Sequence, residues 1–313
     1  MVRARPEQGG GAATSSFGLP EGAGPGLPGG PRPVSIGPVT FRWGEQTYVM
    51  GVLNVTPDSF SGDGLLTAPD PLAAALVQAR AMVAEGAVIL DVGGASSRPG
   101  HPPVQPEDEA ARVVPVVRAI AAALPGTVIS VDTTSPTVAE AALDAGAHML
   151  NDVWGVGDDA TMIRVAAARG VPIVLMHNRA EARYRNLMAE VLTDLQRALD
   201  RALDAGVPWD HLLVDPGFGF GKTPNHNLAL LASLEDLRVL GRPVLLGTSR
   251  KSTLGKVLDL PADQRVEATA ATTALGVAAG VDIVRVHDVR ENIRTARVAD
   301  AILRGWRPAG WPT

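Results

Sequence analysis

The stretch TVISVDTTSPTVAEAALDAGAHMLNDV, residues 127–153, contains one complete strand–helix–strand unit. Two short apolar runs, TVISVDT and HMLNDV, flank a longer alanine-rich segment of helical composition. Both runs are almost continuously apolar, which is typical of parallel strands covered by helices on both faces. The unit therefore predicts a parallel α/β sheet.

The same unit recurs along the chain. Alanine- and leucine-rich stretches separate eight apolar runs: YVMGVLNV, AVILDVG, TVISVDT, HMLNDV, PIVLMH, HLLVDPG, PVLLGTS and DIVRVHD. Eight strands, each followed by a helix, predict an α/β fold of the (β/α)8 TIM-barrel type, which usually needs about 250 residues. A doubly wound open sheet is the alternative, because the number of strands does not show that the sheet closes.

The N-terminal region differs in composition from the rest of the chain. Residues 1–33 are dominated by Gly, Pro, Ala and Ser and predict a flexible, disordered tail, because so little apolar surface cannot offset the entropy of ordering. The segment VTFRWGEQTYVM, residues 39–50, predicts a β-hairpin around its glycine. We therefore expect a tail over 1–33 and one TIM-barrel domain over 34–313.

Composition limits the classes of function. The formal net charge of −5 argues against a dedicated nucleic-acid binder, which usually has a basic face. The chain has no cysteine, which excludes disulfides and thiolate metal sites and is typical of a reducing compartment. No apolar run approaches the roughly 18–20 residues of a membrane span. We expect a soluble, cytoplasmic protein without nucleic-acid or membrane partners.

Polar residues mark the ends of the predicted strands. The eight runs end in Asn54, Asp91, Asp132, Asn151 with Asp152, His177, Asp215, Ser249 and His287. Asp and Asn often do no more than cap helices or begin turns. Because the carboxyl ends of barrel strands meet on one face, eight such ends in a row favour a shared polar site.

Cations gather after the last two predicted strands. Arg250 and Lys251 follow strand seven, and strand eight carries Arg285 and His287 two residues apart, which places both on one side of the strand. This part of a TIM barrel is its usual phosphate position. We therefore expect a ligand that carries phosphate.

The carboxylates indicate a second feature of the ligand. Asp132 and Asp215, with Asn151, could bind the adjacent N–H donors of a flat heterocycle such as a pterin or guanine. Metal binding or general acid–base chemistry would use the same residue types, and spacing does not separate these alternatives.

The segment DPGFGFGKT, residues 215–223, ends like a nucleotide-binding P-loop. The P-loop pattern needs glycine at position 216, where this chain has Pro216. Proline lacks a backbone N–H, so the phosphate cradle would lose a donor. We therefore expect a different role for this loop.

Eight motifs in order closely resemble the dihydropteroate synthase family: MGVLNVTPDSFSGDG, DVGGASSRPG, SVDT, LNDV, LMH, DPGFGFGK, GTSRKS and RVHD. The resemblance covers roughly residues 47–305 and implies a pterin-binding barrel. It implies an enzyme of folate biosynthesis that joins para-aminobenzoate to 6-hydroxymethyl-7,8-dihydropterin diphosphate and releases pyrophosphate. It also implies a Mg²⁺-dependent homodimer, for which the alanine-rich stretch 262–279 is a candidate contact.

The resemblance assigns roles to individual residues. It implies a pterin site of Asp132, Asn151, Met176, Asp215 and Lys251. It implies a diphosphate site of Asn54, Ser97, Arg285 and His287, with Asn54 acting through Mg²⁺. The aminobenzoate would meet Phe60, Arg98, Pro99, Phe220, Lys251 and Ser252. The catalytic groups would be Arg285, His287 and Lys251. The segment DPGFGFGKT would bind the edge of the pterin ring and form a wall of the pocket.

The chain departs from the family pattern in the second loop. Ala95 stands where the family usually has Glu, and Ser97 stands where it usually has Thr. Ser97 keeps a hydroxyl, whereas Ala95 lacks a carboxylate that could help order the loop. Two alternatives stay open: a methyltetrahydrofolate-binding methyltransferase, which shares the pterin-binding barrel, and a non-catalytic pterin-binding paralogue, which Ala95 favours.

Overall fold

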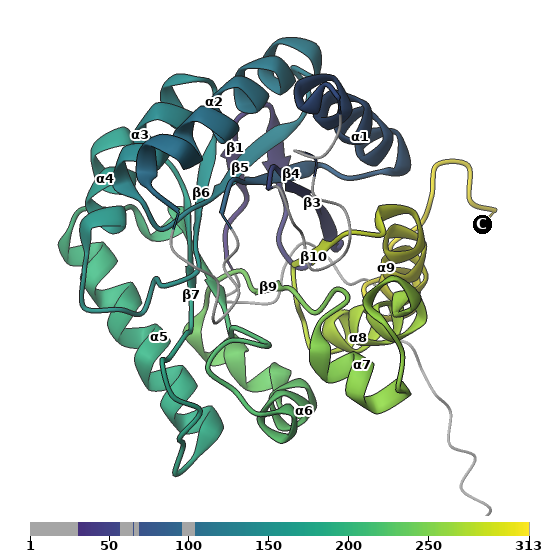
Figure 1. Cartoon of the computed structure of the whole chain (residues 1–313). Helices are drawn as coiled ribbons and strands as arrows, with labels where there is room; N and C mark the ends of the chain where they lie inside the picture. Colours follow the sequence, from purple (N-terminus) through teal and green to yellow (C-terminus); the bar gives the residue numbers. More distant parts are fainter. Residues whose placement is uncertain (1–30, 57–64, 66–68, 96–103, 313) are drawn as a thin grey trace, which may run out of the picture.

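The computed structural model of the chain describes residues 31–56, 65, 69–95 and 104–312. Within these ranges, eight parallel strands form a ring and the helices surround it (Figure 1). The strands are β3 (Tyr48–Asn54), β4 (Ile89–Gly93), β5 (Val128–Asp132), β6 (Met149–Asp152), β7 (Ile173–Met176), β8 (Leu212–Asp215), β9 (Leu245–Leu246) and β10 (Ile283–Val286).

The sheet order shows that the ring closes. The strands run β8-β7-β6-β5-β4-β3-β10-β9, and all neighbours are parallel. One further parallel bridge, between Val214 of β8 and Val244 just before β9, joins the two ends of the sheet. The predicted TIM barrel is therefore confirmed, and the open doubly wound sheet is wrong.

The outer helices follow the strands in turn. They are α1 (Pro71–Glu85), α2 (Pro106–Ala123), α3 (Pro136–Asp144), α4 (Thr161–Arg169), α5 (Leu187–Asp204), α6 (Pro224–Ala232), α7 (Ser252–Leu258), α8 (Val266–Ala278) and α9 (Val289–Leu303). Several start at sequence-encoded caps: the Ser135 side chain accepts from the backbone of Val138 at the start of α3, and Thr223 forms a capping box with His226 at the start of α6.

The N-terminal hairpin exists, but it lies earlier in the sequence than predicted. Strands β1 (Val34–Ile36) and β2 (Val39–Phe41) pair in antiparallel fashion around Gly37, whose φ is 52°. The chain turns again at Gly44, yet the next strand, β3, does not pair with β2. It enters the barrel between β10 and β4, because both of its edges are satisfied there.

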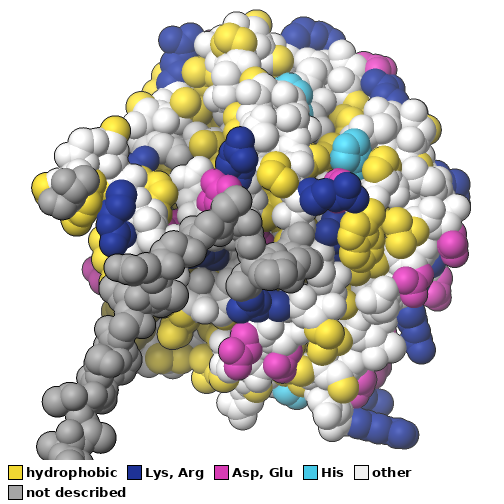
Figure 2. Space-filling model, turned by 180° about the vertical axis from the view of Figure 1, so that it is seen from behind, with side chains coloured by type: hydrophobic (Ala, Val, Ile, Leu, Met, Phe, Trp, Pro, Cys, Tyr) yellow, Lys and Arg dark blue, Asp and Glu magenta, His cyan; other side chains and the backbone are white. Residues whose placement is uncertain are grey.

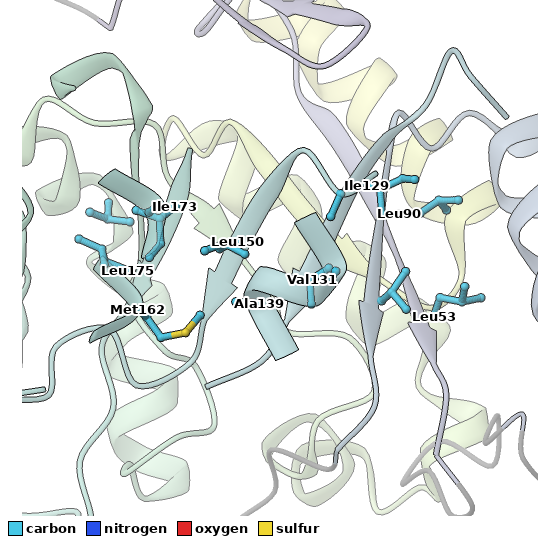
Figure 3. Close-up of a cluster of buried hydrophobic side chains, with 14 of the residues drawn as sticks. Leu53, Leu90, Ile129, Val131, Ala139, Leu150, Met162, Ile173 and Leu175 are labelled. Carbon is cyan, nitrogen blue, oxygen red and sulfur yellow. The ribbon is translucent and has the colours of Figure 1, made fainter. Parts of the chain in front are cut away.

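Two apolar layers build the core. Outward-facing strand residues pack against the helices, and Figure 3 shows this layer with Leu53, Leu90, Ile129, Val131, Ala139, Leu150, Met162, Ile173 and Leu175 labelled. A second cluster joins the hairpin to the first inward-facing residue of each strand, with Phe41, Trp43 and Tyr48 packed against Ile89 and Ile283. The hairpin therefore closes the N-terminal end of the barrel and leaves the other end for a site.

The surface carries mixed charge. On the face seen from behind the view of Figure 1, basic and acidic side chains are interspersed among hydrophobic ones (Figure 2). Among the described residues, no helix combines the length and apolarity that crossing a bilayer requires. The predicted tail falls on residues outside the described ranges, except for 31–33, and the domain boundary at residue 34 stays a prediction.

Candidate functional site

Alternation along the strands places the predicted polar residues inside the barrel. Successive side chains point to opposite faces, so the residues two, four or six positions after the first inward apolar residue of a strand also point inward. Inward positions at or near the carboxyl ends hold Asn54, Asp91, Asp132, Asn151, Met176, Asp215 and Arg285. The register pairs Asp132 with Asn151 and Met176 with Asp215, so these predicted pterin residues are neighbours on consecutive strands.

Arg285 is the centre of a charged cluster at the carboxyl-terminal end of the barrel, which we call the barrel mouth. Its Nε donates to Asp91 Oδ2 at 2.6 Å, and its Nη2 donates to Asp132 Oδ2 at 2.8 Å. Asn151 Nδ2 donates to the same Asp91 oxygen at 3.0 Å. One guanidinium therefore links β4, β5 and β10, and it is oriented by carboxylates before any ligand arrives.

Asp91 is a residue whose role the sequence did not reveal. It appeared among the polar strand ends but in none of the predicted ligand sets, although its side chain is completely buried. Its Oδ1 and the Oγ of Ser130, its register partner on β5, have no hydrogen-bond partner among the described residues. Unpaired buried polar atoms are costly, so this part of the barrel is suited to hold polar ligand groups or water.

A second group forms where the loop after β8 meets the start of α7. Lys251 Nζ donates to the backbone oxygen of Phe218 and lies 4.4 Å from the centre of the Phe220 ring. The Asp215 side chain accepts from the backbone N–H of Gly217 at 2.6 Å. The carboxylate, the ammonium and an aromatic wall therefore share one side of the mouth.

Burial changes the acidity of both lysine and carboxylates. Burial raises the pKa of Asp132 to about 7, although the nearby Arg285 opposes this shift. Burial also raises the pKa of Asp215, against the opposing charge of Lys251. Burial lowers the pKa of Lys251 to about 8, against the opposing charge of Asp215. Perturbed groups of both signs within one cluster are typical of a functional site.

His287 is held by a residue that the sequence did not assign. Ser249 Oγ lies 2.9 Å from His287 Nδ1 and also accepts from the backbone N–H of His287 at 3.1 Å. Next to it, Arg250 adopts a φ of 58° and forms an ion pair with Asp288. Ser249 was recognised only as a polar strand end, because its pairing depends on how β9 and β10 lie side by side.

The predicted aminobenzoate and loop residues are only partly described. Phe220 is half-buried in the site, and Ser252 is exposed at the first turn of α7. Phe60, Ser97, Arg98 and Pro99 lie outside the described residues. Ala95, the last described residue before that gap, is half-buried.

The residues present fit a magnesium ion that is bound mainly by the phosphates of a substrate and only weakly by the protein. Within the described ranges, no group of three or more His, Asp or Glu side chains could hold a metal by itself. Asn54, which is half-buried, offers an amide oxygen at the end of β3, beside Gly93 of β4. Mg²⁺ usually keeps several waters and binds one or two protein groups together with substrate phosphates, which agrees with a single amide.

Comparison with known proteins places this geometry in a family. The family model described as pterin binding enzyme matches residues 50–287, which include every barrel strand from β3 to β10 except the first two residues of β3. The fold and the site thus define the chain as a pterin-binding enzyme.

Individual relatives narrow this class. The dihydropteroate synthase of Clostridium beijerinckii is 47% identical over 272 residues, which cover 87% of this chain and 100% of that protein. The Bacillus subtilis enzyme is 48% identical over 266 residues, covering 85% and 92% of the two chains. This chain belongs to the dihydropteroate synthase family.

Solved structures agree with the sequence relatives. The chain resembles the Clostridium difficile dihydropteroate synthase determined in the presence of pteroic acid, with a TM-score of 0.80, 44% identity and coverage of 84% and 99%. It also resembles the Xanthomonas albilineans enzyme with 4-aminobenzoic acid, with a TM-score of 0.79, 38% identity and coverage of 86% and 96%.

Proposed function

We propose that this chain condenses 6-hydroxymethyl-7,8-dihydropterin diphosphate with para-aminobenzoate, giving 7,8-dihydropteroate and pyrophosphate. As a member of this family it is a transferase of folate biosynthesis. The observation that carries the proposal is one barrel mouth where Asp132, Asn151 and Asp215 face inward beside Lys251 and Arg285. That arrangement offers acceptors for a pterin edge next to cations for a diphosphate.

Pterin recognition would use the carboxylates. The 2-amino-4-oxo edge of a pterin presents adjacent N–H donors, and a carboxylate accepts two parallel N–H bonds. Asp215 already accepts one backbone N–H from Gly217, which fixes its direction and leaves its other oxygen for the ring. Met176, on the neighbouring strand, would pack against the ring face.

Arg285 and His287 would stabilise the leaving group. Negative charge grows on the diphosphate as the C–O bond breaks, and preoriented donors stabilise that charge at no reorganisation cost. Asp91 and Asp132 hold the Arg285 guanidinium in place, and Ser249 orients the His287 ring. Mg²⁺, held through Asn54, would supply further charge stabilisation.

The amine needs little activation. The aniline nitrogen of para-aminobenzoate attacks the pterin methylene, a C–N bond replaces the C–O bond, and the electron pair departs with pyrophosphate. The nitrogen then releases one proton. Because the dihydropterin ring delocalises the developing cation, positioning by Phe220, Lys251 and Ser252 is the main task at this side, and no general base is assigned.

The direct test is pyrophosphate release. Wild type should convert dihydropterin diphosphate and para-aminobenzoate to an adduct only with Mg²⁺ present, and Arg285→Ala should lose most of this activity. Arg290→Ala, which removes a guanidinium exposed on α9, is the matched control and should retain it. Wild type that binds the pterin but forms no adduct would refute the proposal and favour a binding paralogue.

We also propose a homodimer that uses the face formed by α6, α7 and α8. A groove of 620 Å³ on this face is lined mainly by apolar side chains, among them Leu228, Val257 and Leu275, which are exposed. The alanine-rich helix α8 would allow close approach of a second copy.

Light scattering tests this dimer. It should give twice the chain mass for wild type and the single mass for Leu275→Glu. Val77→Glu, at an exposed site on α1, is the control and should stay dimeric. A dimeric Leu275→Glu would remove this face from consideration.

The cytoplasmic location and the flexible tail stay predictions from the sequence.

A further inference from the structure

Lysine is scarce in this chain. Lysine and arginine together number 28, and only three of them are lysines: Lys222, Lys251 and Lys256. Lys256 is exposed on α7, whereas Lys222 lies in the loop that follows β8 and Lys251 donates to that loop from the start of α7. A chain that uses arginine almost everywhere else has one lysine within this loop and one in contact with it.

Burial lowers the pKa of Lys222 to about 7, against the opposing charge of Asp215, and in its protonated form the amine has an acceptor for each of its three protons. Its Nζ lies 2.9 Å from His177 Nδ1, 3.0 Å from the backbone oxygen of Gly217 and 3.1 Å from that of Phe220. A planar guanidinium could not direct donors to three acceptors around one point, whereas an ammonium can. The geometry therefore requires lysine in particular.

His177 is set up to accept this bond. Burial, followed by the charge of Lys222, lowers the pKa of His177 to about 3, so the ring is neutral. With Nδ1 facing the ammonium, the ring proton is on Nε2, which lies 3.3 Å from Asp194 Oδ2. Asp194 accepts from Arg179 at 2.7 Å, which holds its carboxylate beside the ring of His177. Lys222 thus connects the loop to a fixed part of the barrel.

The loop is seated closely on its neighbour. A Cβ at Gly217 would come within 1.8 Å of the backbone oxygen of His177, and one at Gly221 within 2.3 Å of that of Arg179. The two glycines adopt φ values of 69° and 55°. The loop between these points carries Phe218 and Phe220 and reaches across to Lys251.

We propose that Lys222 is a positioning residue for para-aminobenzoate: its ammonium holds the backbone of Gly217 and Phe220 so that the Phe220 ring and the Phe218 carbonyl face Lys251. The proposal rests on the proposed function. The backbone of Asp215 is fixed by the sheet at the end of strand β8, and only its side-chain bond to Gly217 depends on the part of the loop that Lys222 holds, whereas Phe220 lies wholly within that loop. Loss of Lys222 should therefore affect the aminobenzoate side more than the pterin side.

The first test compares Lys222→Met with Lys256→Met, which removes the same charge at an exposed position. Lys222→Met should raise KM for para-aminobenzoate by roughly tenfold or more, as expected for lost hydrogen bonds to a charged group, with a much smaller change in KM for the pterin diphosphate. Lys256→Met should change neither. Equal rises in both KM values, or no rise, would overturn the proposal.

A second test restores the ammonium chemically. Because the chain has no cysteine, Lys222→Cys carries a single thiol, which can be alkylated in the unfolded protein before refolding. Alkylation with 2-bromoethylamine places an ammonium at lysine-like reach, whereas iodoacetamide adds a neutral group. The aminoethyl form should regain a low KM for para-aminobenzoate and the neutral form should not. Identical KM values for the two forms would refute the role of the ammonium.

These outcomes separate the two proposals. A wild-type protein that forms no pterin–aminobenzoate adduct contradicts the proposed function. A wild-type protein that forms it, with a Lys222→Met variant that keeps the wild-type KM for para-aminobenzoate, contradicts only the role of Lys222. Thermal melting of each variant reports whether the fold is retained.

Discussion

The charged cluster around Arg285 depends on a residue that no ligand set contained. Asp91 is fully buried and accepts from both Arg285 and Asn151, so it determines where two predicted ligand residues point. A buried charge pair contributes little net stability, but removal of one partner leaves the other charge uncompensated. The cluster therefore supports the geometry of the site more than the stability of the fold.

Asp91→Asn tests this reading. The change should lower the free energy of unfolding by about 3 kcal/mol, because Arg285 loses a buried counter-charge, and it should reduce kcat for adduct formation. Urea unfolding and product assay measure the two effects. Glu85→Gln, which breaks the more exposed pair with Arg290, should cost less than about 1 kcal/mol and leave kcat unchanged. Similar losses in the two variants would contradict the special position of Asp91.

The pH dependence of kcat/KM follows from two opposite shifts. Asp132 has a pKa of about 7, above its usual value, so it becomes a charged carboxylate that can accept N–H bonds with both oxygens only as the pH rises through that value. Lys251 has a pKa of about 8, below its usual value, and loses its charge above it. We expect a bell-shaped profile with its maximum between these two pKa values, since kcat/KM reports the free enzyme.

Lys251→Arg provides the control for that profile. Arginine does not titrate in this range, so the alkaline limb should disappear while the acidic limb stays, whatever the overall loss of activity. An alkaline limb that persists in this variant would assign it to the substrate or to another group.

At the scale of single residues, the sequence predicted which side chains face the barrel mouth, but it did not predict the hydrogen bonds between those side chains. Strand alternation was enough to place Asp132, Asn151, Asp215 and Arg285. The bonds among them depend on the register between β4, β5 and β10, which are far apart in sequence. Ser249 was missed as the partner of His287 for the same reason.

At the scale of elements, the loop after β8 is shaped by direct contact with the loop after β7. Gly217 and Gly44 both adopt positive φ, at 69° and 80°, but only Gly217 has backbone in the space that a Cβ would occupy. A methyl group added at Gly44 would therefore meet only the unfavourable φ, whereas one added at Gly217 would meet a similarly unfavourable φ and also clash with the backbone of His177.

Gly217→Ala should be much more damaging than Gly44→Ala. Both variants should lose about 1 kcal/mol of unfolding free energy from the unfavourable φ. Gly217→Ala should lose a further 1–3 kcal/mol or so, because the loop must move away from His177. It should also raise KM for para-aminobenzoate, as Phe220 moves with the loop. Equal stability losses, measured by denaturant unfolding, would show that the loop accommodates the methyl group.

The misplaced hairpin shows what local patterns could not provide. Residues 39–50 have the composition of a hairpin, with Gly44 at its centre, and Gly44 does form a turn. The strand after it is needed inside the barrel, where β10 and β4 satisfy both of its edges. Only the closed sheet, and not the local segment, determines that β1 and β2 pair with each other instead.

At the scale of the whole molecule, the barrel separates stability from chemistry along its axis. Phe41 of the hairpin packs with Trp43 and Tyr48 at the N-terminal end, whereas the inward-facing polar residues occupy the other end. In TIM barrels generally, the active site lies at the carboxyl ends of the strands, and the opposite face contributes to stability.

Phe41→Ala tests that separation. Phe41 is fully buried, with its ring centre 5.1 Å from that of Trp43 and 4.7 Å from that of Tyr48, so its truncation should lower the free energy of unfolding by about 3–5 kcal/mol. Well below the new melting temperature, kcat and both KM values should remain those of wild type, because no part of the hairpin belongs to the cluster around Arg285 or to the loop after β8. Trp311→Ala, at an exposed position, should alter stability by no more than about 0.5 kcal/mol. If Phe41→Ala instead raised KM for the pterin diphosphate while the protein stayed folded, the two ends of the barrel would be coupled, and the hairpin would have to be counted as part of the binding machinery.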